Sequence, residues 1–279
     1  MIEKLLLYYS AYPTVRYATI SIILIALCSA LLGVILVLRQ YSMIGDGLSH
    51  VTFGATAVAT VLGLATPIYV ALPLTVLAAV LILKLRDSTK IHGDSAIAMI
   101  SVGALAFGYL LLNLFGDEHQ RASDACATLF GSGILSIRLL DVILCLILSV
   151  AVIFVFIFFY NKLFAVSFDE DFAASCGTRI NFYNTLIAIV TAVTVVVAMN
   201  LLGALLVSAL VIFPALSAMR IFKTFKQVTA CAACISLFNA LIGIAASLLM
   251  ASPIGPTIVV ADLATFLICS LIGAIRKRL

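Results

Sequence analysis

The chain alternates between long apolar stretches and short polar ones over most of its length. Each apolar stretch has about 20 residues, the number that an α-helix needs to cross the roughly 30 Å hydrocarbon core of a bilayer. The pattern predicts about nine membrane-spanning helices, at 17–38, 45–65, 68–86, 94–115, 139–160, 182–200, 203–221, 227–250 and 257–275. Eight helices also fit, if the chain only kinks between Asn200 and Gly203.

Composition points the same way, because 65% of the residues are hydrophobic, 10% are charged and the mean hydropathy is +1.29. A soluble domain carries about 25% charged residues. We therefore expect an all-α, polytopic membrane protein in contact with the lipid bilayer, with residues 1–279 forming a single transmembrane domain. The net charge of +4 comes from basic residues at helix ends and forms no stripe, so nucleic acid is not an expected partner.

Basic residues predict the orientation, because cytoplasmic loops carry an excess of lysine and arginine. Because successive predicted helices cross the membrane in opposite directions, each basic residue can be assigned to one of the two ends of the bundle. One end has Arg39, Lys84, Arg86, Lys90, Lys162, Arg179, Arg220, Lys223, Lys226, Arg276, Lys277 and Arg278, and the other has Lys4, Arg16, Arg121 and Arg138. We therefore expect the C-terminus in the cytoplasm and the N-terminus outside.

The second apolar stretch begins with an ionisable pair, Asp46 and His50. Four residues correspond to about 400° of helical rotation, so both side chains leave the same face one turn apart. A carboxylate and an imidazole suit manganese, zinc or ferrous iron without choosing among them. Two protein ligands leave such an ion mostly hydrated or in need of ligands from a second chain. The alternative is that Asp46 caps the helix and His50 bonds to a neighbouring helix.

A polar segment between the fifth and sixth apolar stretches predicts a short capped helix on the cytoplasmic side. Ser167, Phe168, Asp169 and Glu170 fit the S-x-x-E pattern of a capping box, and Gly177 suits the residue after a helix end. Phe168 and Phe172 would then share one face, four residues apart. Two aromatic side chains on an exposed helix suit insertion into a groove of a soluble partner. The alternative is a surface helix lying on the membrane.

Other polar residues in the apolar stretches are weaker candidates. Asp262 and the asparagines Asn113, Asn200 and Asn239 suit hydrogen bonds between helices. The outer loop 116–138 carries Asp117, Glu118 and His119, and it is either a vestibule or partner contact or a plain solvated loop.

The chain has no motif for catalysis or nucleotide binding. A G-x-x-x-x-G-K-[ST] loop, an HExxH helix and a GxSxG elbow are all missing from the sequence. We therefore expect that the protein is not an enzyme and binds no cofactor itself.

The sequence resembles the membrane-spanning permease subunit of the manganese/zinc/iron ABC importer family over nearly its whole length. Five stretches carry the resemblance: 39–50, 92–100, 129–135, 202–215 and 256–259. The first resembles the family's Gly-Asp-Ala-Leu-Ser-His signature, with Gly47 in place of the alanine. One departure follows, because Val51-Thr52-Phe53-Gly54 replaces the usual Ala-x-Leu-Pro-Gly.

The resemblance implies a type II ABC-importer-like fold in the prokaryotic plasma (inner) membrane. It implies a homodimer with the pathway between the subunits, a cytoplasmic ATPase subunit that binds the ATP, and an extracytoplasmic solute-binding protein. Asp46 and His50 match the pair that meets the ion. Phe168, Asp169, Glu170, Phe172 and Gly177 match the coupling helix. The same architecture importing a chelated-iron or organic cargo, a proton-coupled metal carrier, and a receptor or structural membrane protein are the alternatives.

Overall fold

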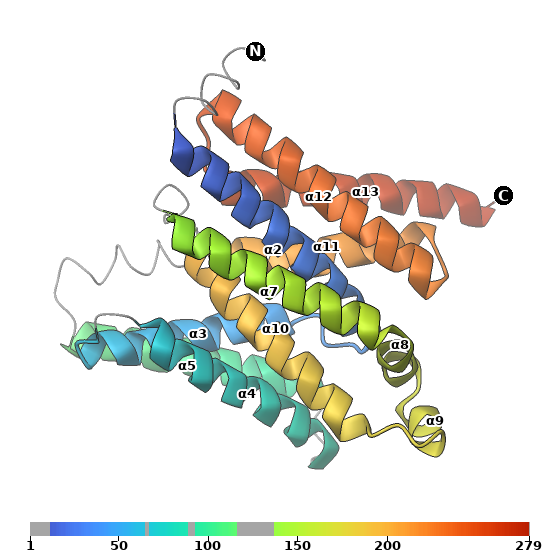
Figure 1. Ribbon diagram of the computed structural model, residues 1–279, viewed down its shortest axis with the longest axis horizontal. Helices are drawn as coiled ribbons and strands as arrows, with labels where there is room; N and C mark the ends of the chain where they lie inside the picture. Colours follow the sequence, from blue (N-terminus) through green and yellow to red (C-terminus); the bar gives the residue numbers. More distant parts are fainter. Residues whose placement is uncertain (1–11, 65–66, 89–92, 116–136, 279) are drawn as a thin grey trace.

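The computed structural model describes residues 12–64, 67–88, 93–115 and 137–278, and all its regular structure there is helical (Figure 1). Nine of the helices in the described ranges have 18 residues or more, and they lie at the predicted positions. They are α2 (Pro13–Leu38), α3 (Ile44–Val61), α4 (Ile68–Ser88), α5 (Gly93–Phe115), α7 (Leu139–Phe158), α10 (Ile180–Leu202), α11 (Ala204–Ile221), α12 (Phe225–Met250) and α13 (Ile254–Arg278). Two short helices, α8 (Tyr160–Phe168) and α9 (Glu170–Ser175), follow α7.

Within the described ranges, seven of the long helices are apolar and long enough to cross a membrane. The other two are α3 and α4. In α3 the polar residues Asp46, Ser49, His50 and Thr52 interrupt the apolar stretch. In α4 the described apolar segment covers Ile68–Ile82, and the side chains of the rest of the helix lie outside the described residues. The expected all-α membrane fold is therefore confirmed, with the number of helices only approximate.

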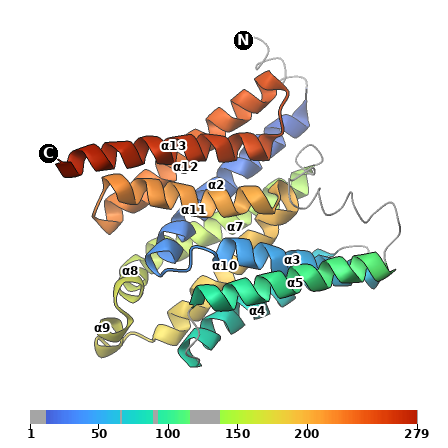
Figure 2. The same cartoon turned by 180° about the vertical axis from the view of Figure 1, so that it is seen from behind.

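Helix α10 ends at Gly203, and a separate helix, α11, begins after it, so the chain does not form one kinked helix there. Gly203 has a positive φ of 88°, a conformation that glycine adopts without a steric cost. It ends α10 and begins α11, which runs back along the bundle (Figures 1 and 2). The two helices are therefore separate, as the nine-helix prediction requires.

The long helices form two packed groups with α2, α7 and α10 between them. One group joins α3, α4 and α5, and the other joins α11, α12 and α13, with α2 packed against both α11 and α12 (Figure 2). Of the helices between the two groups, α10 packs against α4, and α7 packs against α2. The C-terminal end of α13 and the short helix α9 lie at the same end of the bundle, and the start of α2 lies at the other (Figure 1).

Glycines allow the closest contacts between these helices. A Cβ atom on Gly33 of α2 would collide with the backbone carbonyl of Val211 in α11. A Cβ atom on Gly54 of α3 would lie 2.7 Å from the carbonyl oxygen of Ala104 in α5. Lipid tails are as apolar as the helix surfaces, so helices in a membrane associate through close packing and not through a hydrophobic drive.

We expect Gly33→Ala to destabilise the protein, because the new methyl group meets backbone atoms that cannot rotate away. Overpacking of this kind costs about 1–3 kcal/mol. Gly103→Ala is the matched control, because a Cβ atom there has nothing within 4 Å. Thermal unfolding of the detergent-solubilised protein should show a lower midpoint for Gly33→Ala alone. Equal midpoints for the two variants would contradict a close contact between α2 and α11.

Candidate functional site

Asp46 lies in the first turn of α3, just after a tight turn that follows α2. The backbone N–H of Tyr41 donates to the carbonyl of Leu36, and Gln40 has a positive φ of 60°. Helix α3 then begins at Ile44, with Met43 as its N-cap residue and no side-chain cap. Asp46 is therefore not the N-cap, as the alternative interpretation assumed, but an acid in the first turn, where a negative charge is favourable.

Asp46 and His50 face each other along α3, as their spacing predicts. The Oδ2 atom of Asp46 lies 3.5 Å from Nε2 of His50. The Oδ1 atom of Asp46 lies 3.4 Å from the hydroxyl of Ser208, in α11. The side chains of Asp46 and His50 are 41% and 21% exposed, so both can be reached from outside this subunit. The structure thus adds Ser208 to the pair, a residue that the sequence pattern did not single out.

The two glycines beside Asp46 bring the neighbouring helices close to the pair. Gly45 lies against α11, where an added Cβ atom would be 3.7 Å from Cγ2 of Val211. Gly47 lies against α5, where an added Cβ atom would be 2.5 Å from Cγ2 of Ile97 and 2.8 Å from the hydroxyl of Ser101. The fully packed Ile97 therefore gives a steric reason for glycine at position 47, where the family pattern has alanine.

Asp46 and His50 supply two possible metal ligands from one subunit. Within the described residues, no group of three or more His, Cys, Asp or Glu side chains is placed to hold a metal ion. The outer-loop residues Asp117, Glu118 and His119 lie outside the described residues.

The short helix after α8 is present, but its predicted capping box is wrong. Ser167 belongs to the last turn of α8, where its hydroxyl donates to the carbonyl of Leu163 at 2.6 Å. The N-cap of α9 is Asp169, whose carboxylate accepts a hydrogen bond from the backbone N–H of Phe172 at 2.9 Å. Because α8 continues to Phe168, the cap and the helix start are shifted, and α9 has only six residues.

The predicted end of this helix is correct. Gly177 has a positive φ of 75° and its N–H donates to the carbonyl of Ala174, while Thr178 donates to Ala173. Phe168 and Phe172 belong to different helices, so the expected pairing four residues apart on one helix is wrong. Both are nevertheless exposed, at 63% and 64%. Two aromatic side chains therefore project at the end of the bundle where α9 lies.

A buried arginine ties this short helix to the bundle. The guanidinium of Arg39, directly after α2, forms an ion pair with Glu170, the first residue of α9. The same Nη2 atom donates to Oδ1 of Asn184 in α10 at 2.8 Å, and the guanidinium carbon lies 5.9 Å from the centre of the Tyr41 ring. The Arg39 side chain is only 2% exposed. The sequence indicates a cytoplasmic charge at Arg39 but not these contacts, because its partners are 131 and 145 residues away in the chain.

The polar residues of the other helices pack as interhelical or local hydrogen bonds. Asn239 in α12 donates to Oδ1 of Asp262 in α13 at 2.7 Å, and Thr265 donates to Oδ1 of Asn239 at 2.9 Å. Asp262 is fully buried. Asn200, in contrast, donates within its own helix, to the carbonyl of Val196. The packing interpretation of Asp262 and Asn239 therefore holds, whereas Asn200 does not link two helices through this bond.

Ionisable side chains within a membrane bundle commonly mark a path for ions or substrates. Comparison with known proteins agrees. The family model described as "ABC 3 transport family" matches residues 11–273. The chain therefore belongs to the ABC 3 transport family, which confirms the resemblance found in its motifs.

Named relatives and a solved structure extend this comparison. The manganese import system permease protein ScaB of Streptococcus gordonii is 26% identical over 279 residues, which cover 100% of this chain and 98% of ScaB. The high-affinity zinc uptake system membrane protein ZnuB of Haemophilus influenzae is 26% identical over 88% of this chain and 92% of ZnuB. PsaBC from Streptococcus pneumoniae in complex with Fab shares the fold, with a TM-score of 0.82 at 24% identity, covering 96% of this chain and 95% of that chain.

We expect Asp262→Asn to preserve stability, because an amide oxygen can still accept the hydrogen bond of Asn239. Asp262→Ala should lower stability by about 1–3 kcal/mol, the cost of leaving a buried polar group without its partner. Thermal unfolding in detergent compares the two variants. If Asp262→Ala were as stable as the wild type, the Asn239–Asp262 bond would not contribute to packing of α12 against α13.

Proposed function

We propose that this chain is the permease subunit of an ATP-driven ABC importer that moves a divalent transition metal ion into the cytoplasm. Manganese and zinc are the first candidates, with ferrous iron as the third. Family membership supports the class of transporter, and the names of ScaB and ZnuB support the class of cargo. The observation that carries the proposal for this chain is the Asp46–His50 pair, with its 3.5 Å separation and partial exposure.

The spacing of the pair suits a metal ion with little rearrangement. For an ion about 2.1 Å from both Oδ2 of Asp46 and Nε2 of His50, the oxygen–metal–nitrogen angle would be roughly 110°, close to the tetrahedral value. Ser208 supplies a further oxygen at 3.4 Å from the carboxylate. The remaining ligands would be water or side chains of a second subunit. An incomplete site of this kind suits transport, because an ion that is held too tightly cannot leave.

The exposure of Asp46 and His50 supports a pathway between two copies of the chain. In a homodimer that joins these faces, the pathway would contain two carboxylates and two imidazoles. An extracytoplasmic solute-binding protein would deliver the ion at the end where α2 begins. A cytoplasmic ATPase would dock at the end that carries α9, with the N-terminus outside and the C-terminus inside, as the distribution of basic residues predicts.

The contacts of Arg39 with Glu170 and Asn184 suggest how a movement of the ATPase could be transmitted to the ion site. We expect the ATPase to contact α9 through the exposed Phe168 and Phe172, with Asp169 and Gly177 holding the two ends of that helix. A movement of α9 would pull on Glu170 and hence on Arg39, because the charged hydrogen bond joins a buried guanidinium to a partly buried carboxylate. Arg39 is seven residues before Asp46 in the chain. Movement of Arg39 would therefore shift the start of α3, and alternating access would follow as the two subunits rock against each other.

We expect Asp46→Ala and His50→Ala to abolish metal uptake while the protein still assembles, because each variant removes one of the two ligands. The measurement is whole-cell metal content by mass spectrometry, in a strain that lacks the gene and carries each variant. Loss of manganese alone, or of zinc alone, would also name the cargo. Thr60→Ala is the matched control on α3, because its hydroxyl only donates to the carbonyl of Thr56 in the same helix.

Retained uptake in Asp46→Ala would contradict the site. Unchanged levels of every divalent metal in the strain without the gene, under metal scarcity, would instead favour a chelated or organic cargo. A proton-coupled carrier predicts uptake without an ATPase, which collapses with the proton gradient.

We expect Glu170→Gln to lower the uptake rate by about tenfold, which corresponds to a barrier higher by about 1.4 kcal/mol. The change removes the charge that Arg39 holds and keeps the shape of the side chain. Asp171→Asn is the matched control, because Asp171 is the next acid of α9 and is exposed. The complete transporter in proteoliposomes, with its ATPase and binding protein, allows ATP hydrolysis and ion uptake to be measured together. Equal uptake by both variants would exclude the Arg39–Glu170 route.

A further inference from the structure

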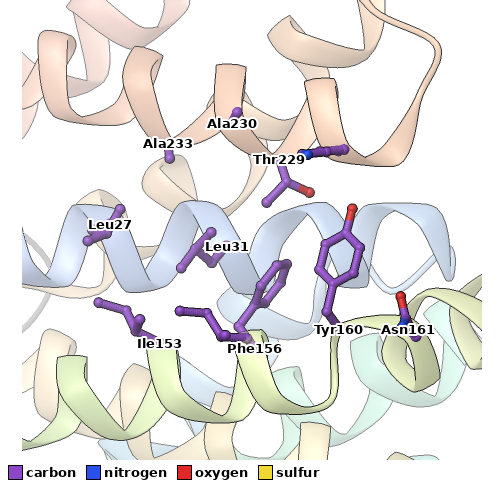
Figure 3. Close-up of a pocket in the computed structure, with 11 residues that line it drawn as sticks. Leu27, Leu31, Ile153, Phe156, Tyr160, Asn161, Thr229, Ala230 and Ala233 are labelled. Atoms are coloured by element: carbon purple, nitrogen blue, oxygen red, sulfur yellow. The ribbon is translucent and has the colours of Figure 1, made fainter.

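A groove of about 670 Å³ runs between α2, α7 and α12, and α7 and α12 lie toward the viewer in Figure 1. Leu27 and Leu31 of α2 form its floor, and Ile153 and Phe156 of α7 and Ala233 of α12 form its walls (Figure 3). Clefts of roughly 300–1,000 Å³ commonly hold small ligands. The size and the lining suit an apolar chain.

One end of the groove is polar, and two separate elements make it so. Tyr160 and Asn161 come from the start of α8, and Lys226 and Thr229 come from the first two turns of α12. Figure 3 shows Tyr160, Asn161 and Thr229 together at one end, with Leu27, Ile153 and Ala233 toward the other. The groove therefore matches an amphiphile, with an apolar body and a head that bears hydrogen-bond acceptors and a negative charge.

The polar end lies at the same end of the bundle as α9, because α8 leads directly to α9 and α12 begins there (Figure 1). In the proposed orientation this is the cytoplasmic side of the membrane. Basic pockets between helices on that side bind the head groups of anionic lipids. Lys226 is exposed at the groove and can reach such a head group.

We propose that this groove binds one anionic phospholipid of the inner leaflet. An acyl chain lies along Leu27, Leu31 and Ile153, and the phosphate is held by Lys226 with hydrogen bonds from the Tyr160 and Asn161 side chains.

A lipid fits the groove better than a second copy of the chain. The helices α7 and α12, which line the groove, lie toward the viewer in Figure 1, whereas α3, α5, α11 and α13 lie toward the viewer in Figure 2. A dimer formed through the Asp46 and His50 face would leave the groove directed toward the membrane. Ile157, at the edge of the groove, is 72% exposed. An exposed apolar side chain of this size suits contact with lipid tails, which are as apolar as the helix surface.

Native mass spectrometry of the detergent-solubilised protein tests this proposal, with phosphatidylglycerol and phosphatidylcholine as the two probes. We expect one phosphatidylglycerol per chain, bound about fivefold more tightly than phosphatidylcholine, as one lysine near an anionic head group predicts. Lys226→Ala should remove this preference. Lys223→Ala is the matched control, because Lys223 is exposed in the same inner segment and does not line the groove.

Ala233→Phe supplies an independent variant that fills the apolar part of the groove. It should lower the binding of both lipids, while Lys226→Ala lowers only that of phosphatidylglycerol. Equal binding of the two lipids to the wild type, or an unchanged preference in Lys226→Ala, would overturn the proposal. Cross-linking of Ala230→Cys to the same residue of a second copy would overturn it too, because a subunit would then cover the groove. None of these outcomes depends on which ion is transported.

Discussion

The close approach of α2, α3 and α11 around Val211 is the contact on which the candidate site depends. Gly33 of α2 lies against the backbone of Val211, and Gly45 of α3 lies against its side chain. Because Ser208 is one turn before Val211, this packing brings the Ser208 hydroxyl to the Asp46 carboxylate. A larger residue at position 33 would separate α2 from α11. Helix packing in lipid relies on such small residues, so the geometry of the Asp46–His50 pair and the architecture of the bundle have a common physical origin.

Two sets of polar side chains in the described helices differ in their exposure. Asn239, Asp262 and Thr265 bond to one another inside the α12–α13 pair and need no access to the surface. Asp46 and His50 remain partly exposed, and they make α3 less apolar than the seven candidate spans. A polar helix is tolerated in a membrane where it lines a wet path or meets another subunit. The polarity of α3 and the exposure of its ionisable pair are therefore consistent with one another.

Arg39 gives the bundle a mechanical connection that the apolar contacts do not provide. A buried guanidinium is costly unless its partners are in place, so its position is defined by Glu170 of α9 and Asn184 of α10 together. The loop from Arg39 to α3 is short and held by backbone hydrogen bonds. Through the Arg39–Glu170 ion pair, the short helix α9 is attached to the C-terminal end of α2. Through the short loop that follows Arg39, it is also connected to the start of α3. The groove between α7 and α12 includes Tyr160 and Asn161 of α8, the helix that leads directly to α9.

The sequence alone determined the helices and the Asp46–His50 pair, because apolar length and a four-residue spacing are local properties of the chain. It also located the end of α9, since Gly177 is a local signal. It failed at the start of α9, where the pattern at Ser167 also fits the last turn of a preceding helix. Only the tertiary structure decided the remaining partners. Ser208 is 162 residues from Asp46, and Glu170 and Asn184 are 131 and 145 residues from Arg39. No local pattern records such contacts, because they arise when separate helices pack side by side.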